Sequence, residues 1–350
     1  MRNLFFVVAA SILIIIFLSW NKKKEPSVRE VNVTTLEERT QNKIKGLHEA
    51  AKAYEEGGEI QEALRTWREI VKTYPTDEST SEALFSLIKI YLDQKKRDPA
   101  DVYFKKLEEG FPESKEMPKA LYYRGQFFKK EGELQSSQKD YQRLVKNFFF
   151  FDKMSEVQKT LDALNMKLLF SKKVTAGTQI YQVQSGDSLS TIANKFNTPI
   201  DFLLQANGLK IDSVIHPRDP LKVFGPDVKV GVSVDKSQKN MLLMFNGTVL
   251  RRYDIAIGRN NSTLAGKFAV QNKLKDPVWF NAGRAILPSD PRNILGTRWL
   301  GFDRDMGIHG TIDKKHILDQ TSNGCIRMNN GDVEQLYAIL RVGDPVVIVE

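Results

Sequence analysis

Cysteine is almost absent from this sequence, because its 350 residues include only Cys325. One cysteine cannot form an intramolecular disulfide, so its thiol is either an inert buried side chain or a nucleophile. Clusters of histidine, cysteine and carboxylate residues at metal-binding spacings are also missing, which argues against a metalloenzyme. We therefore expect no metal and no other cofactor, and the role of the lone thiol becomes the main question.

A concentrated excess of charge is missing as well. The 52 lysines and arginines exceed the 43 aspartates and glutamates by nine, and the surplus is diffuse apart from Lys22, Lys23 and Lys24. No basic stripe interleaved with aromatic residues occurs, so a nucleic-acid partner is not expected. The 20 Phe, 10 Tyr and 4 Trp exclude disorder throughout, and the length predicts two or three domains.

Long hydrophobic runs are lacking except for one near the N-terminus, which argues against a protein with several membrane spans. Leu4 to Trp20 is an apolar run of 17 residues, interrupted only by Ser11 and Ser19. As a helix it spans about 25 Å, near the lower limit for crossing a bilayer. Small residues typical of a signal-peptidase site are missing at its end, so residues 1–24 are predicted to be an uncleaved membrane anchor with a basic flank. A cleaved signal peptide is the alternative.

Residues 41–150 show a helical pattern of apolar residues that repeats every 37 positions. Five sets of residues keep this spacing: Leu47, Leu84 and Leu121; Tyr54, Tyr91 and Phe128; Trp67, Phe104 and Tyr141; Ile70, Leu107 and Leu144; and Tyr74, Phe111 and Phe148. Helix pairs of this length stack into a solenoid, with turns expected at Gly57-Gly58 and Gly132. The pattern resembles tetratricopeptide repeats and is assigned to 41–170. These repeats are either a rigid spacer or a groove that docks a protein partner.

A small module of strand, helix, helix and strand is predicted next. Tyr181 begins a short strand, Ser188 is a candidate N-cap for the first helix, and Thr198 is a candidate N-cap for the second. Asn207-Gly208 is typical of a helix end. A module of this size is at the limit of independent stability.

The residues of this module resemble a LysM domain over 179–224. The resemblance is carried by the segments Tyr-Gln-Val-Gln-Ser-Gly-Asp-Ser-Leu at 181–189 and Asn-Gly-Leu at 207–209, while Pro-Arg-Asp at 217–219 departs from the usual Pro-Gly-Gln turn. It implies binding of glycans that contain N-acetylglucosamine, chiefly peptidoglycan. The implied groove lies between two loops, formed by Gly186, Asp187 and Ser188 and by Ile211 and Asp212.

From residue 228 the apolar pattern changes from helical to alternating, which predicts a mostly β domain over 228–350. Asn246-Gly247 between two such segments indicates a type I′ hairpin. Near the end, Asp332 is a candidate N-cap for one appreciable helix, and Pro345 to Val349 reads as a final strand.

Two short segments of this domain contain the residues for chemistry, Ile-His-Gly-Thr at 308–311 and Ser-Asn-Gly-Cys-Ile-Arg-Met at 322–328. A thiol is mostly protonated at neutral pH and needs a base, which His309 can supply. Gly324 allows the chain to turn sharply, so that backbone N–H groups can point at a developing oxyanion. The planar guanidinium group of Arg327 is suited to binding a carboxylate. The alternative is a buried, inert Cys325 with an unrelated histidine.

These segments resemble the signature of the L,D-transpeptidase catalytic domain, the YkuD-like family. Thr-Leu-Ala-Gly-Lys-Phe at 263–268 and Gly-Thr-Arg-Trp-Leu at 296–300 add to the resemblance. Asn323 stands where many members have a second histidine, and Leu264 replaces a proline. Neither departure affects Cys325 or His309.

The resemblance implies specific roles for the residues of the motif. Cys325 would be the nucleophile and His309 the general base, with the imidazole oriented by the backbone carbonyl of Gly310. Backbone amides at Gly324 and Cys325 would bind the oxyanion, and Arg327 would hold a substrate carboxylate. Next to these catalytic residues, Ser322 and Asn323 are assigned to substrate binding.

The sequence as a whole predicts a multidomain protein: an N-terminal transmembrane helix, an all-α solenoid, a small βααβ LysM module and a mostly-β catalytic domain. The predicted function is a peptidoglycan L,D-transpeptidase that forms 3→3 cross-links through a cysteine thioester. Alternatives are an L,D-carboxypeptidase, a protein-to-peptidoglycan transferase with the same acyl-enzyme, and a non-catalytic wall-binding scaffold.

This function needs a location in the cell envelope, with the catalytic domain in the periplasm or outside the cell. The lysines at 22–24 outnumber Arg2 and the terminal amine, and that distribution favours the cytoplasm for the C-terminal side. We give more weight to the functions predicted for the LysM module and the catalytic domain, which require a place outside the cytoplasm, than to this distribution of charge. The expected partners are peptidoglycan, the membrane and, if the repeats form a groove, a protein.

Overall fold

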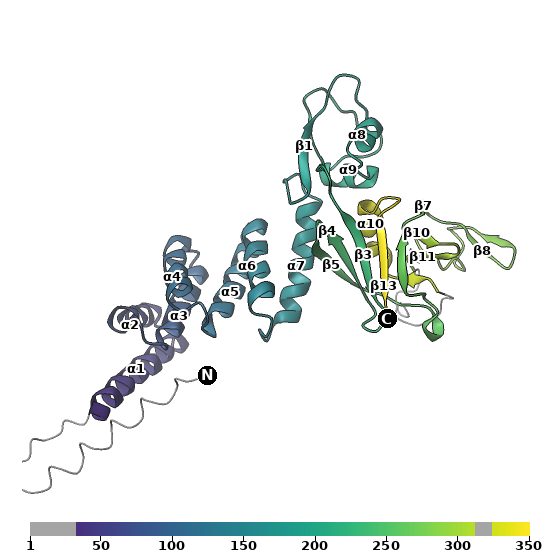
Figure 1. The fold of residues 1–350 in the computed structure, drawn as a ribbon. Helices are drawn as coiled ribbons and strands as arrows, with labels where there is room; N and C mark the ends of the chain where they lie inside the picture. The colour runs from purple at the N-terminus through teal and green to yellow at the C-terminus, as the bar shows by residue number, and fades with distance from the viewer. Residues whose placement is uncertain (1–32, 312–323) are drawn as a thin grey trace, which may run out of the picture.

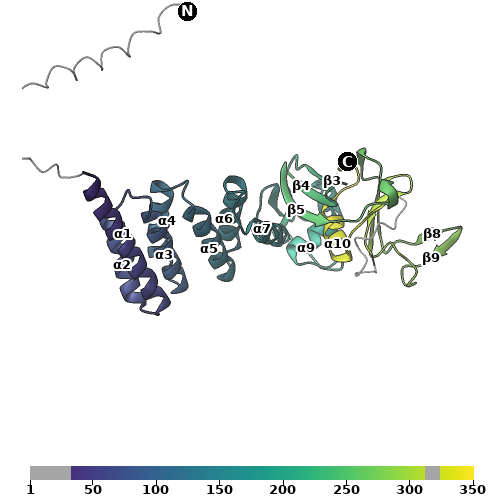
Figure 2. The same cartoon turned by 90° about the horizontal axis from the view of Figure 1, so that it is seen from below.

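The computed structural model of the chain describes residues 33–311 and 324–350. The apolar run at 4–20 and its basic flank lie outside the described residues. Within these two ranges, no helix is long and apolar enough to cross a membrane. A row of helices leads to a β-rich domain (Figures 1 and 2), and a small module stands above the place where the two meet in the view of Figure 1.

The helical part of the chain follows the predicted period. Its helices are α1 (Val33–Glu56), α2 (Ile60–Thr73), α3 (Thr80–Asp93), α4 (Arg97–Gly110), α5 (Glu116–Lys130), α6 (Leu134–Asn147) and α7 (Met154–Leu169). The starts of α2, α4 and α6 are 37 residues apart. One register of the pattern, Trp67, Phe104 and Tyr141, is buried in the common core. The 37-residue pattern therefore reports helix pairs that stack on one another.

The turn inside each helix pair has a left-handed residue at an equivalent position. Gly58 has φ +78° and Gly132 has φ +80°, as the glycines in the sequence indicate. Lys95 lies midway between them in the repeat and has φ +58°. The second unit therefore makes the same turn without glycine, at a cost in backbone strain that the packed helices must offset.

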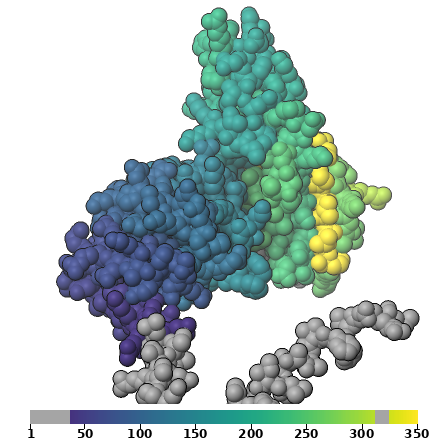
Figure 3. All heavy atoms as spheres, turned by 60° about the vertical axis from the view of Figure 1, so that its left-hand side comes forward, coloured from purple at the N-terminus to yellow at the C-terminus, as the bar shows by residue number. Residues whose placement is uncertain are grey.

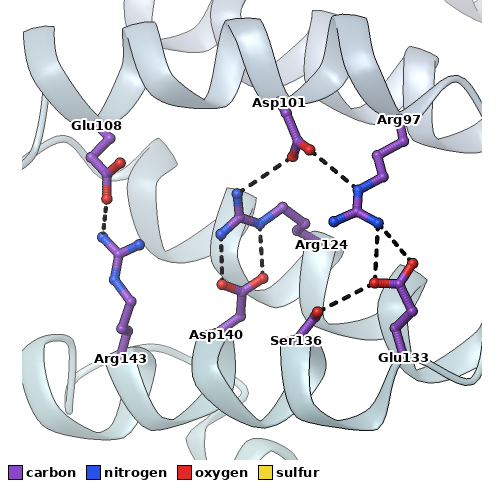
Figure 4. A network of polar contacts seen from close by, with 8 residues as sticks. All are labelled: Arg97, Asp101, Glu108, Arg124, Glu133, Ser136, Asp140 and Arg143. Carbon is purple, nitrogen blue, oxygen red and sulfur yellow. Dashed lines mark hydrogen bonds and ion pairs between the residues drawn. The ribbon is translucent and has the colours of Figure 1, made fainter.

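Charged side chains on α4, α5 and α6 form a network across the repeats (Figure 4). Arg124 binds Asp140 through two hydrogen bonds of 2.7 and 2.8 Å, and its guanidinium lies over the ring of Phe104. Arg97 binds Glu133 at 2.9 Å. The positively and negatively charged side chains on this surface are thus paired with one another.

The small module has the predicted order of elements, β1 (Thr178–Gln182), α8 (Leu189–Lys195), α9 (Ile200–Asn207) and β2 (Pro220–Phe224). Its strands pair antiparallel, and Ser188 caps α8 through a capping box with Thr191. Thr198 was a wrong choice of cap for α9, which begins after Pro199. The Thr198 hydroxyl instead accepts a hydrogen bond from the backbone N–H of Phe224, so it fixes the helix start to β2.

The described residues of the β-rich domain form two sheets, a small two-stranded hairpin, a short 3-10 helix at Arg259–Asn261 and one α-helix of ten residues. Its elements are β3 (Val230–Asp235), β4 (Asn240–Phe245), β5 (Thr248–Asp254), β6 (Gly266–Ala269), β7 (Asn272–Lys275), β8 (Trp279–Asn281), β9 (Arg284–Ile286), β10 (Arg298–Asp303), β11 (Met306–His309), β12 (Ile326–Arg327), α10 (Asn330–Ile339) and β13 (Pro345–Val349). The sheet orders are β5-β4-β3-β13-β6 and β12-β11-β10-β7, and β8 pairs with β9. Apolar side chains of both sheets and α10 form one core.

Two local predictions in this domain have different outcomes. Asn246 (φ +50°) and Gly247 (φ +76°) form the turn of the β4–β5 hairpin, and both are left-handed as a type I′ turn requires. Asp332 does not cap α10, because the helix begins after Asn329. The side chain of Asn329 accepts a hydrogen bond from the backbone N–H of Asp332.

Helix α7 connects the repeats to both other parts of the chain. On one face, Asp162 accepts a hydrogen bond from the N–H of Arg252 at 3.0 Å, and Asn165 donates to the carbonyl of Leu250 at 2.9 Å. These two side chains supply partners to β5, which is the edge strand of its sheet. Helix α7 therefore closes this edge in place of another strand.

The C-terminus of α7 is bound by Lys222 of β2. The Lys222 ammonium group is fully buried and donates to the carbonyls of Leu168, Leu169 and Ser171 at 3.2, 2.7 and 3.0 Å. A cation at this place is favoured by the helix dipole. We call the contacts of Asp162, Asn165 and Lys222 the joint. Apolar residues of α7, α9 and β2 also belong to the core of the β-rich domain, which explains how so small a module is stable.

Candidate active site

Strand pairing brings the two chemical segments together. Strands β11 and β12 are parallel neighbours, with Ile308 opposite Ile326 and His309 opposite Arg327. Both isoleucines are buried in the core, so the alternation of side chains directs His309 and Arg327 to the other face of the sheet. Cys325 directly precedes β12, and Gly307 lies at the corresponding place on β11. Residues 16 positions apart in sequence therefore share one face, which we call the active-site face.

The imidazole of His309 is held in one tautomer by the backbone. Its Nδ1 lies 2.7 Å from the carbonyl oxygen of Gly310. A carbonyl can only accept a hydrogen bond, so Nδ1 carries the hydrogen and the lone pair of the neutral ring is on Nε2. Burial is the main cause that lowers the pKa of His309 to about 4. The backbone contacts with Gly310 and Leu295 act to raise this pKa, and the positive charge of Arg327 acts with burial to lower it. The ring is therefore neutral at pH 7.

The thiol of Cys325 is half-buried beside the backbone of β11. Its Sγ lies 3.5 Å from the carbonyl of Asp305, to which a protonated thiol donates. Burial raises the pKa of Cys325, while the backbone N–H of Gly307 and the charge of Arg327 act to lower it. The raised pKa keeps the thiol protonated at neutral pH, so attack on a carbonyl needs a base that removes its proton.

Gly324 has a conformation that other residues rarely adopt. Its φ is +132°, and a side chain there would contact Met306 Sδ at 3.0 Å. Its carbonyl accepts a hydrogen bond of 3.0 Å from the hydroxyl of Thr263, which itself accepts from the N–H of Gly258. Thr263 is fully buried and thus connects the turn after β5 to the residue before the cysteine. The sequence motif contained Thr263, but its contact was not predicted.

Asn330 holds the backbone that follows His309. Its Oδ1 accepts a hydrogen bond from the N–H of Thr297 at 3.1 Å, and a Cβ on Gly310 or Gly296 would overlap this oxygen. Glycine at 310 therefore lets Asn330 approach the peptide whose carbonyl binds His309. Asn330 directly follows the cap of α10, and no periodic or motif signal had marked it.

The other residues assigned to the site lie elsewhere. Asp187 accepts hydrogen bonds from Tyr181 Oη and Gln184 N, and these contacts lower its pKa. Gly186 is left-handed at φ +86°, and Ser188 is the N-cap of α8, so these three residues shape one loop.

Ile211 and Asp212 are exposed on the loop after α9. This loop and the one at 186–188 belong to the module that projects from the surface (Figure 3), and Figure 1 shows this module apart from β11. Ser322 and Asn323 lie outside the described residues. Within 33–311 and 324–350, no group of three His, Cys, Asp or Glu residues could hold a metal ion.

Comparison with known protein families gives a match for the β-rich domain, for the small module and for two segments of the helical part. The L,D-transpeptidase catalytic domain matches residues 229–348, the LysM domain matches 181–224, and the tetratricopeptide repeat matches 47–77 and 119–148. The predicted combination of these three families is confirmed.

Similar proteins agree with the match to the catalytic domain. A putative L,D-transpeptidase of Bacillus subtilis, YkuD, is 33% identical over 176 residues, which cover 48% of this chain and 97% of that protein. A second, YqjB, is 34% identical over 126 residues, which cover 34% of this chain and 70% of that protein. A crystal structure of an L,D-transpeptidase from Mycobacterium tuberculosis covers 39% of this chain and 75% of its own, with 16% identity and a TM-score of 0.31. On the strength of the two sequence relatives, the chain belongs to the YkuD-like family of L,D-transpeptidases.

Proposed function

We propose that this chain is a peptidoglycan L,D-transpeptidase with Cys325 as its nucleophile and His309 as its general base. The observation that carries this proposal is the placement of a neutral imidazole on the same sheet face as the only thiol of the chain. The contact between Nδ1 and the Gly310 carbonyl leaves the basic lone pair on Nε2. A protonated thiol and a neutral imidazole are the starting states that general-base catalysis requires.

The first half of the reaction breaks one peptide bond and forms a thioester. Cys325 Sγ attacks the carbonyl carbon of the third residue, a diamino acid, of a donor stem peptide, while its proton passes to Nε2 of His309. The imidazolium then gives this proton to the leaving amine, and terminal D-alanine departs. Backbone amides at Gly324 and Cys325 are the proposed donors to the oxyanion, because the φ of Gly324 turns the chain sharply at this point.

The second half returns the thiol and forms the cross-link. The side-chain amine of a second stem attacks the thioester carbonyl and gives a proton to His309, which protonates the departing Cys325 sulfur. One amide bond is broken and one is formed, so the sequence needs no ATP and yields a 3→3 link. Arg327 is buried beside both groups and is proposed to hold a substrate carboxylate.

A carbapenem tests the nucleophile directly, because its β-lactam acylates a reactive cysteine. Intact-protein mass spectrometry is expected to show one adduct on the wild type and none on Cys325→Ala. His309→Asn should form the same adduct much more slowly. An adduct that survives Cys325→Ala, or a wild type that forms none, would contradict the assignment. Muropeptide products then separate transfer, which gives dimers, from hydrolysis, which gives shortened monomers.

The small module is proposed to hold peptidoglycan near the catalytic domain and so raise the local concentration of stem peptides. Ile211 is 71% exposed on a loop of the proposed groove, and Val214 on the same loop is 76% exposed, so apolar side chains on this loop are available to a ligand. Ile211→Asn should weaken co-sedimentation with purified peptidoglycan. Val342→Asn is the matched control, because Val342 is 62% exposed on the β-rich domain. Equal effects of both variants would refute this groove.

The helical repeats are proposed to be a rigid spacer between a membrane anchor and the wall-modifying domains. Support comes from the joint, which fixes α7 to the domain, and from the mutual pairing of charges in Figure 4. The catalytic domain would then lie in the periplasm or outside the cell. A reporter fused to the C-terminus, active on one side of a membrane only, checks this location. A cytoplasmic signal would overturn the anchored, extracytoplasmic arrangement.

A further inference from the structure

A tryptophan lies against the face of His309. Trp299 of β10 is directly opposite His309 of β11 in the antiparallel pair, so both side chains are on the active-site face. The two rings are stacked, with centroids 5.9 Å apart and planes inclined by 20°. Directly opposite positions are the closest that two strands offer, and aromatic pairs at such positions interact favourably.

Two glycines make room for the indole. Gly301 and Gly307 are opposite each other on β10 and β11, next to the Trp299–His309 pair. A Cβ at Gly307 would lie 2.6 Å from Cζ2 of the indole, and a Cβ at Gly301 would lie 2.9 Å from its Nε1. Any other residue at either position would displace the ring. The indole N–H also donates to Asn272 Oδ1 of β7 at 3.0 Å, which fixes the direction of the ring.

The backbone of Gly307 links the indole to the nucleophile. Its N–H acts on the Cys325 thiol, and its Cα lies beneath the indole. Trp299 therefore contacts both the imidazole and the glycine whose N–H acts on the thiol, although no sequence motif gave it a role. The side chain is half-buried, so one part of it packs on the sheet and another part meets solvent.

We propose that Trp299 is a positioning residue that fixes the plane of the His309 imidazole, so that its Nε2 points toward the Cys325 thiol. This inference rests on the proposed function, because it assumes that His309 acts as the base. The Gly310 carbonyl restrains the ring within its own plane through Nδ1, and the indole restrains it from one face. Two restraints in different directions are enough to hold a planar ring that has two side-chain torsions.

The stack also favours the neutral form of the base. An aromatic face attracts a cation, but it also excludes the water that an imidazolium needs. Exclusion of water prevails here, since burial is the largest cause of the lowered pKa of His309. Loss of the indole should therefore admit water and move this pKa upward toward 6.5.

Three variants of the full chain test this role. Trp299→Leu removes the ring, Trp299→Phe keeps a smaller ring, and Asn272→Ala releases the indole N–H. The rate of Cys325 acylation by a carbapenem should fall by about 10- to 100-fold in Trp299→Leu, because small misplacements of reacting groups have effects of this order. Trp299→Phe should recover most of the rate, and Asn272→Ala should show a smaller loss in the same direction.

The matched control is Phe302→Leu, on the same strand. Phe302 is fully buried in the core rather than on the active-site face, so its loss loosens β10 without touching the stack. At a temperature where all variants are folded, its acylation rate should stay within about twofold of the wild type. Equal losses in Phe302→Leu and Trp299→Leu would assign the effect to general loosening and would overturn the proposal.

Titration of the His309 ring by NMR gives a readout that does not depend on catalysis. In Trp299→Leu the pKa should rise, and the low-pH limit of the acylation profile should move upward with it. An unchanged pKa together with an unchanged rate would refute the positioning role. If His309→Asn acylates at the wild-type rate, the proposed function of His309 is wrong, whereas a shifted pKa in Trp299→Leu would still show that the indole controls this ring.

Discussion

The joint and the active-site face both bury an ionisable side chain, but this side chain is charged in the joint and neutral on the active-site face. Lys222 in the joint gives its three N–H groups to three backbone carbonyls, and although burial lowers its pKa to about 8, it remains charged at pH 7. His309 on the active-site face has its Nδ1 on the carbonyl of Gly310, and burial lowers its pKa to about 4, so it is neutral.

The difference separates a structural ion from the proposed base. A buried cation with every donor bonded resists movement, because movement would leave carbonyls without partners. A neutral imidazole with one committed nitrogen keeps the other available for proton transfer. Substitutions in the joint should therefore reduce stability and spare the chemistry, whereas substitutions on the active-site face should do the reverse.

The largest expected effect is loss of the proposed base. His309→Asn should reduce the rate of Cys325 acylation by about 10²–10⁴-fold, the usual contribution of a general base. The melting temperature, followed by circular dichroism, should change little in comparison, because the core isoleucines on the opposite face are retained. A variant that is inactive only because it is unfolded would contradict the division between the two regions.

Sequence patterns predicted the parts of the molecule that depend on local periodicity. The 37-residue period, the Asn246-Gly247 hairpin and the order of elements in the small module were all readable because each depends on neighbours along the chain. The pairing of His309 with the cysteine segment was predicted through a motif, not through geometry. Lys95 shows the limit of even the local signals, since it adopts the left-handed turn that glycine makes in the other two units.

The joint and the surroundings of His309 depend on contacts between distant segments, which no local pattern contains. Lys222 lies in a short strand whose alternation would direct it to solvent, yet α7 covers that face and buries it. Trp299 meets His309 across a pair of strands, and Asn330 reaches the backbone after His309 because Gly310 has no side chain. Their residue types are ordinary for a strand and for a helix start, so only the folded structure reveals their contacts.

The next largest effect should come from the joint. Lys222→Met removes the cation and leaves buried carbonyls at the end of α7 without their donor, which should lower the free energy of unfolding by about 3 kcal/mol. Urea denaturation measures this change, with Lys229→Met as an exposed lysine control. The acylation rate of the folded fraction should equal that of the wild type. A stable but inactive Lys222→Met would refute the purely structural role.

Acid should destabilise the active-site face in a way that His309 controls. The pKa of His309 is about 4 in the folded chain and 6.5 when unfolded, so the unfolded chain binds more protons between these values. Stability is therefore lost as the pH falls from 6.5 to 4, by about 3 kcal/mol for a shift of this size. Urea denaturation at several pH values should show a shallower acid loss for His309→Asn. Parallel curves for the two proteins would mean that other groups dominate.

The smallest effect is expected for an exposed ion pair in the repeats. This pair tests whether burial or the pairing of charge determines how much such a contact contributes to stability. Arg97 and Glu133 are 46% and 39% exposed, although their 2.9 Å contact is as short as those of Lys222. Water screens such pairs, so Glu133→Gln should change the free energy of unfolding by at most about 0.5 kcal/mol, and 0.5 M salt should remove the difference. A loss comparable to that of Lys222→Met would show that contact length, rather than burial, sets the energy of these ion contacts.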